Sequence, residues 1–140
     1  MKMFEKKWVD LGLPSGTLWC DLNEEGYYSW NEMMNKFDEE SLPKLTDFAE
    51  LCVYCDWRWD DKKKGMLVIG SNTNSIFLPA LGCHFMTDGN LYNIGHEGYY
   101  WSVSYGNYAY YLCFTHNNII SPSRAGSNAF NRTVRCIKRK

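Results

Sequence analysis

The sequence predicts one α+β domain, and three observations lead to this prediction. First, the chain has 140 residues, of which 45% are hydrophobic and 22% charged, the balance of a globular domain with a buried core. Second, two segments before residue 56 carry apolar residues at helical spacing. Third, many short segments that alternate apolar and polar residues indicate mostly antiparallel strands. We therefore expect a single domain over residues 1–140, without a linker or a repeat.

Two short strands and a helix are expected in the first part of the chain. The strands fall at residues 9–11 and 17–22, on either side of a Pro-Ser-Gly turn. Ser29 and Glu32 then have the spacing of a capping box, in which each side chain accepts a hydrogen bond from the other residue's backbone N–H. This spacing predicts a helix of about two turns over residues 30–37.

The next segment predicts a second helix after a Leu-Pro pair. Its apolar residues recur at helical spacing and are expected to pack against the core; they are Leu45, Phe48, Leu51, Cys52 and Cys55. Cys52 and Cys55 also form a Cys-x-x-Cys pair, but a zinc site needs a second ligand pair, which the sequence does not offer. The six cysteines of the chain are expected to be free, reduced thiols, because no export signal precedes them.

A hairpin is expected in the middle of the chain. Residues 65–70 and 75–81 flank Ser71-Asn-Thr-Asn, which is the pattern of two strands joined by a turn. Asp60 and Asp61, followed by three lysines, are expected at the exposed tip of a further hairpin, because such a run of charges is stable only in water.

The last part of the chain predicts further strands and one long loop. The strands are expected at residues 99–104, 109–115 and 133–138. Residues 116–131 are rich in Asn, Ser, Gly and Pro and predict a loop. Apolar alternation in residues 9–11 and 134–137 predicts that the first and last strands pair and bring the chain ends together.

Composition excludes several classes of function. The net charge of −1 argues against a nucleic-acid partner or a membrane-surface partner, since both require a basic excess. No apolar stretch approaches the roughly 20 residues of a membrane span. The three histidines are scattered, and His96-Glu97 suggests a turn rather than a metal site. No phosphate-binding loop, nucleophile elbow or carboxylate pair is present, so we expect no catalytic residue, metal or cofactor.

The C-terminal quarter instead has the composition of a binding surface. It is dense in Tyr, Asn and Ser, which supply stiff amphipathic area and adaptable hydrogen bonds, and no acidic residue follows Glu97. Alternation along the strands predicts that Trp101, Leu112, Phe114 and Val134 are buried beneath one exposed, contiguous face. The expected ligand-binding residues on that face are Val103, Tyr105, Asn107, Tyr108, His116, Asn118, Arg124, Asn128, Asn131 and Arg132.

Several motifs, in order along the chain, resemble a known family. They include Val9-Asp-Leu-Gly-Leu-Pro-Ser-Gly-Thr-Leu-Trp, Gly98-Tyr-Tyr-Trp-Ser and Val134-Arg-Cys-Ile. Together they resemble the Fibrobacter succinogenes major paralogous domain family and its relatives in gut Bacteroidetes and their phages. The resemblance implies a C-type-lectin-like fold, with paired terminal strands and a central antiparallel ribbon that displays a variable ligand-binding face. The calcium-binding tripeptides of sugar-binding lectins are absent, so calcium-dependent sugar binding is not implied.

The resemblance extends to the variable proteins of diversity-generating retroelements. In those proteins it implies mutagenesis at adenines of Asn codons, which cannot produce Lys, Glu, Met, Trp or Gln. None of the first four occurs between Ser102 and Ile137, and the chain contains no Gln. This pattern raises the hypothesis that residues from about 102 to 135 are diversified.

Three functions are compatible with these features of the sequence. The first, and favoured, is a non-enzymatic display domain that binds a protein or glycan on a cell surface, carried by a phage or bacterium. The second is a structural or assembly protein of a virion or cell surface, whose aromatic face forms oligomer contacts. The third is an enzyme of the formylglycine-generating type, for which Cys113 and Cys136 are the candidate thiols. Without a signal peptide, cytoplasmic synthesis is expected, with virion association and surface display both left open.

Overall fold

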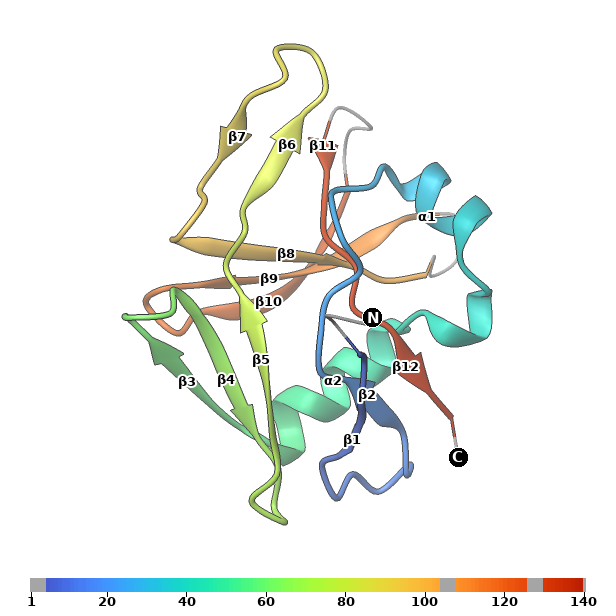
Figure 1. Ribbon diagram of the computed structural model, residues 1–140, viewed down its shortest axis with the longest axis vertical. Coiled ribbons are helices and arrows are strands. Elements are labelled where there is room, and N and C mark those ends of the chain that lie inside the picture. Colours follow the sequence, from blue (N-terminus) through green and yellow to red (C-terminus); the bar gives the residue numbers. More distant parts are fainter. Residues whose placement is uncertain (1–4, 104–107, 126–129, 140) are drawn as a thin grey trace.

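The computed structural model describes residues 5–103, 108–125 and 130–139. Over these residues the chain is α+β, as predicted, and its strands form four three-stranded antiparallel sheets (Figure 1). The helices are α1 (Trp30–Lys36) and α2 (Leu45–Tyr54), with the 3-10 turn η1 (Glu39–Ser41) between them. The strands are β1 (Trp8–Asp10), β2 (Leu18–Cys20), β3 (Asp56–Asp60), β4 (Gly65–Ile69), β5 (Ser75–Pro79), β6 (Cys83–Phe85), β7 (Leu91–Tyr92), β8 (Glu97–Trp101), β9 (Tyr110–Thr115), β10 (Ile120–Arg124), β11 (Phe130–Asn131) and β12 (Ile137–Lys138).

Helix α1 begins with the predicted capping box. The Ser29 hydroxyl accepts from the Glu32 N–H at 3.0 Å, and the Glu32 carboxylate accepts from the Ser29 N–H at 2.8 Å. These two bonds satisfy backbone donors that a helix start otherwise leaves free. The predicted helix over residues 30–37 is thereby confirmed to within one residue, because Phe37 is the extended C-cap.

Helix α2 is confirmed, but only part of its predicted apolar stripe is buried in the core, since Leu45 and Cys55 are half-buried. Phe48 and Leu51 are fully buried, whereas Cys52 is exposed and borders an open groove between α2 and β10. At the helix start, the Asp47 carboxylate accepts from the backbone N–H of Lys44 at 2.8 Å. A lysine side chain cannot accept a hydrogen bond, so Asp47 provides the side-chain cap alone.

The core is divided into two clusters of buried side chains. One lies between α2 and the central strands and contains Trp19, Phe48, Tyr100 and Phe114 among others. The second lies under α1 and is built around Trp101. The predicted burial is confirmed for all four residues named for it, Trp101, Leu112, Phe114 and Val134.

The terminal strands share a sheet, but the predicted pairing of residues 9–11 with 134–137 is wrong. The sheet order is β1-β2-β12, so β1 and β12 each pair with β2 and not with each other. Strand β2 contains Trp19 and Cys20, both fully buried. A strand with this much buried apolar area is stabilised most at the centre of the sheet, and its two edges receive the two chain ends. Strand β12 is also shorter than the strand predicted at 133–138.

The segment 116–131 is not the loop that its composition predicted, because it contains β10 and β11. Strand β10 pairs with β9 in a five-residue register despite Pro122. A proline lacks the N–H that a central strand donates, but β10 is an edge strand of the order β10-β9-β8, where this loss is tolerated. The strands β3, β6 and β7 were also not predicted. The expected exposed tip after Asp60 is confirmed as the β3–β4 turn. No helix of the described residues is long and apolar enough to span a membrane.

The six cysteines are all free in the structure, which leads to a thiol prediction. Titration of the denatured, non-reduced protein is expected to find six thiols; four or fewer would contradict this.

In the native protein, burial raises the pKa of Cys55 and of Cys113 to about 11. Because the thiolate is the nucleophile, we expect iodoacetamide to label Cys113 slowly at pH 8 and faster as the pH approaches 11. Mass spectrometry of native samples labelled across this range measures the rate.

Candidate functional site

Four of the predicted ligand-binding residues are exposed, but they lie at two separate ends of one hairpin. Tyr108 and Arg124 meet at the open end of the β9–β10 hairpin, where the guanidinium carbon lies 4.4 Å from the ring centroid. His116 and Asn118 lie in the turn at the other end. A strand of six residues spans about 20 Å, so these four residues form two groups separated by about the length of the hairpin.

Two predicted residues are buried, which corrects the expectation that they are exposed. Val103 is 7% exposed, and its N–H donates to the Pro43 carbonyl at 2.9 Å, which holds it in the cluster under α1. Alternation gives Val103 the same side of the chain as the buried Trp101, two residues before it, so the expectation that Val103 is exposed was wrong. Arg132 is 6% exposed, because its backbone pairs with Tyr28 in both directions at 2.8 Å and its guanidinium lies against the Trp101 and Tyr111 rings. The remaining predicted residues are Asn131, which is half-buried, and Tyr105, Asn107 and Asn128, which lie outside the described residues.

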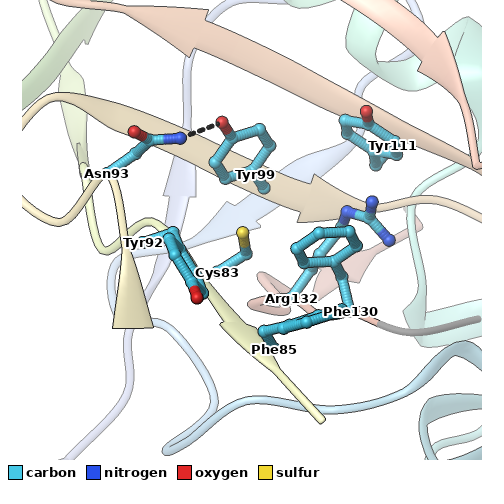
Figure 2. Close-up of a pocket in the computed structure, with 8 residues that line it drawn as sticks. All are labelled: Cys83, Phe85, Tyr92, Asn93, Tyr99, Tyr111, Phe130 and Arg132. Carbon is cyan, nitrogen blue, oxygen red and sulfur yellow. Dashed lines mark hydrogen bonds between the residues drawn. The ribbon is translucent and has the colours of Figure 1, made fainter. Parts of the chain in front are cut away.

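The structure places a different feature beside Arg132, a pocket of about 350 Å³ that is open to solvent (Figure 2). It lies where β8 and β9 meet the small sheet of order β11-β6-β7. Five of its eight lining residues are aromatic, and one is charged. The lining residues are Cys83, Phe85, Tyr92, Asn93, Tyr99, Tyr111, Phe130 and Arg132. We call this the aromatic pocket.

Strand alternation explains one wall of the aromatic pocket. Tyr100 and Leu112 pair across β8 and β9 and face the core, so their neighbours Tyr99 and Tyr111 face the opposite side. The Tyr99 and Tyr111 rings then meet edge to face, with centroids 5.8 Å apart. The same β8–β9 pair therefore supplies core on one face and pocket wall on the other.

Cross-strand pairing explains the opposite wall. Phe85 of β6 is directly opposite Phe130 of β11, and their ring centroids are 4.9 Å apart. The Tyr92 ring of β7 meets the Phe85 ring edge to face, with centroids 6.1 Å apart. The Tyr92 hydroxyl donates a hydrogen bond to the Asp88 carboxylate. This wall joins segments that are far apart in the sequence, so its position depends on the β6–β11 pairing.

A hydrogen-bond chain fixes the polar groups at the rim. The Asn93 amide donates to the Tyr99 hydroxyl at 2.9 Å, and that hydroxyl donates to the Glu97 carboxylate at 2.8 Å. Burial, and then this hydrogen bond to Glu97, raise the pKa of Tyr99 above its ordinary value. Near neutral pH this part of the pocket thus presents a protonated hydroxyl.

Arg132 is the charged residue of the aromatic pocket. Its guanidinium carbon lies 4.0 Å from the Tyr111 ring centroid, 4.6 Å from that of Trp101 and 5.6 Å from that of Phe130. Figure 2 shows the guanidinium between the Tyr111 and Phe130 rings. Among the described residues, its buried Nε and Nη1 have no hydrogen-bond partner, and it belongs to no ion pair. Burial lowers the pKa of Arg132 from its ordinary value.

The other buried arginine, Arg135, shows what a structural arginine looks like in this chain. Its Nε donates to the Asn23 amide oxygen at 2.7 Å, and its two terminal nitrogens donate to the carbonyls of Cys20 and Phe77 at 2.9 and 2.5 Å. Every guanidinium nitrogen of Arg135 is therefore used to join β2, β5 and the C-terminal segment. The guanidinium of Arg132 makes no comparable set of bonds.

The two thiols considered for the enzyme hypothesis lie in different surroundings. Cys113 is 3.8 Å from the Glu97 carboxylate, whereas Cys136 is buried in the cluster under α1. Burial raises the pKa of both thiols, which disfavours the reactive thiolate form. No group of three or more potential metal-ligating side chains occurs in the described part of the chain. Comparison with family models, curated proteins and solved structures found no match to this chain.

Sequence reasoning missed most of the aromatic pocket. The alternation in Gly98-Tyr-Tyr-Trp carries a signal for Tyr99, because this tyrosine must lie on the face opposite the buried Tyr100. No comparable signal exists for Phe85 and Phe130, since each belongs to a strand of two or three residues.

Proposed function

We propose that this chain is a ligand-binding display domain, with a C-type-lectin-like arrangement, that recognises a protein or glycan on a cell surface. The observation that carries the proposal is the aromatic pocket, a solvent-open hollow walled by five aromatic rings. Small-molecule and group recognition sites are concave and mostly apolar, with few polar groups that set orientation. Tyrosines also contribute strongly to binding, because they bury a large area at low entropic cost.

The proposal assigns different roles to the two parts of the pocket. Tyr111, Phe130 and Arg132 lie in the segment from about 102 to 135 that we hypothesise to be diversified, whereas Tyr92 and Tyr99 precede it. Each wall would then combine a constant residue with a diversified one, Tyr99 with Tyr111 on one side and Phe85 with Phe130 on the other. The exposed pair Tyr108 and Arg124 would extend the contact area along the β9–β10 hairpin.

The test is binding of the labelled protein to printed glycans and to intact bacterial cells. We expect Tyr92→Ala to weaken binding at least about tenfold, because Tyr92 is both pocket wall and 40% exposed. The double variant Tyr108→Ala, Arg124→Ala should weaken it further. The matched control is Tyr54→Ala, which removes a tyrosine on α2 that is 55% exposed and lines no part of the pocket, and it should bind as the wild type does. Unchanged binding by all the Tyr92 and Tyr108 variants would contradict the proposal.

A second candidate function, assembly in a virion or on a cell surface, is supported by a separate observation. An apolar groove of about 460 Å³ runs between α2 and β10, bordered by Leu45, Val53 and Pro122. Val53 on the α2 side of this groove is 72% exposed. Exposed apolar residues grouped in this way are typical of contact surfaces. Analytical sedimentation of the wild type and of Val53→Asp tests this candidate function. It requires that the wild type sediments as an oligomer and that Val53→Asp sediments as a monomer.

A further inference from the structure

The unusual chemical feature of the aromatic pocket is a buried cation, Arg132, that forms no ion pair with any residue the structure describes. Arg132 is 6% exposed and lines the pocket, and no carboxylate is among the lining residues. Buried polar groups in folded proteins are almost always hydrogen-bonded, and an exception indicates a missing water, ion or ligand. The Nε and Nη1 groups of Arg132 are such exceptions within the described ranges.

Aromatic contacts explain only part of this arrangement. A guanidinium over Tyr111 and Trp101 gains cation–π stabilisation through its flat face. The N–H groups point outward in the plane of the guanidinium, so ring faces do not satisfy them. Arg135 shows that this fold can supply carbonyl acceptors to a buried arginine. The difference between the two arginines therefore calls for an acceptor that the described residues do not supply.

We propose that the aromatic pocket binds a carboxylate carried on a six-membered ring, and that Arg132 pairs with the carboxylate. This inference rests on the proposed binding function and names the ligand class of that same site. A guanidinium matches a carboxylate in shape and hydrogen-bond geometry. One cation in an apolar pocket balances the single charge of a carboxylate, whereas a phosphate would bring up to two charges.

The rest of the pocket indicates the ring. Tyr99 and Tyr111 on one side and Phe85 and Phe130 on the other present aromatic surfaces to whatever lies between them. The pocket volume of about 350 Å³ is at the lower end of the range for ligand sites, which suits one ring with its substituents. The Asn93 amide at the rim can meet a polar substituent on that ring.

The test uses two acids, each with a neutral counterpart, on the wild-type protein. Benzoate is compared with benzamide, and methyl glucuronide with methyl glucoside, by NMR titration at millimolar ligand. We expect at least one acid to shift the Tyr92 and Tyr99 amide signals and to bind at least about tenfold more tightly than its neutral counterpart, since a charge-assisted hydrogen bond adds this much. Binding of benzoate alone identifies a flat acid, and binding of the glucuronide alone identifies a sugar acid.

The variants separate an effect of Arg132 from a general effect of charge. Arg132→Gln should remove the preference for the acid, and Arg132→Lys, which keeps the charge but not the planar fork, should retain only part of it. Arg58→Gln changes an exposed arginine on β3, outside the pocket, and should leave the preference intact. If Arg132→Gln does not fold, the wild-type comparison of acid and neutral ligand still decides the question.

The outcomes also separate this inference from the proposed function. Equal binding of acid and neutral compounds in the pocket would overturn the carboxylate assignment and leave a binding pocket in place. No binding of any of the four compounds would overturn it as well, and the Tyr92→Ala result on cells and glycans would then decide the proposed function by itself. An acid preference that survives Arg132→Gln would refute the role of Arg132.

Discussion

Replacement of Trp101 by alanine is expected to lower the free energy of unfolding by about 3–5 kcal/mol. The Trp101 side chain is 2% exposed and fills the centre of the cluster under α1, with Met33 and Val134 among its neighbours. Its indole N–H also donates to the Tyr28 carbonyl at 2.7 Å. The variant would leave a large cavity and an unpaired acceptor, and a domain of this size has only about 5–15 kcal/mol in total. Urea unfolding followed by circular dichroism measures the loss.

Two further tryptophan variants make this prediction specific. Trp101→Phe keeps most of the apolar volume and loses the hydrogen bond, so we expect a smaller cost of about 1–2 kcal/mol. Trp8→Ala removes a tryptophan that is 41% exposed on β1, and it should change stability by less than about 1 kcal/mol. Equal losses for Trp8→Ala and Trp101→Ala would contradict the packing described for the second cluster.

Replacement of Arg135 by methionine is expected to cost about 3 kcal/mol or more. The guanidinium is 1% exposed and joins three acceptors, so its removal leaves the carbonyls of Cys20 and Phe77 and the Asn23 amide without these donors. Each buried polar group left unsatisfied costs about 1–3 kcal/mol. Thermal and urea unfolding of the variant, at the same protein concentration as the wild type, provide the measurement.

The matched comparison is Arg132→Met, which removes the other buried arginine. Relief from burying an unpaired charge offsets the loss of its aromatic contacts, so we expect a clearly smaller change in stability than for Arg135→Met. Similar losses in both variants would mean that Arg132 is a structural residue like Arg135. A small loss for Arg132→Met together with a large one for Arg135→Met would separate a residue held for binding from a residue held for folding.

Arg124 and Arg132, both predicted as ligand-binding residues, differ strongly in their surroundings. In the sequence, Arg124 and Arg132 have similar surroundings, because both are cations in a polar, aromatic segment. In the structure Arg124 remains exposed above the Tyr108 ring, whereas Arg132 is enclosed by aromatic side chains. Contacts made by Arg124 are screened by water and salt, while a pairing made by Arg132 would take place at a much lower effective dielectric. Arg132 is therefore the stronger candidate for an energetic anchor.

The features that the sequence determined by itself are local ones. Ser29 and Glu32 specify the start of α1 because both partners of the capping box lie within one helical turn. The charged run after Asp60 specifies the β3–β4 turn because charges remain in water. Alternation in β9 specifies that Leu112 and Phe114 are buried, since residues two apart on a strand face the same side.

The features that only the tertiary structure decided depend on which distant segments meet. Strand β2 lies between β1 and β12 because its buried residues belong at the centre of a sheet, and neither chain end carries that information. Pro122 fits in β10 only because β10 is an edge strand. The aromatic pocket forms because β6 pairs with β11, which brings Phe85 opposite Phe130 and leaves Arg132 beneath the rings. Such long-range pairings depend on the total area buried across the whole molecule, and a local pattern of residues does not encode that quantity.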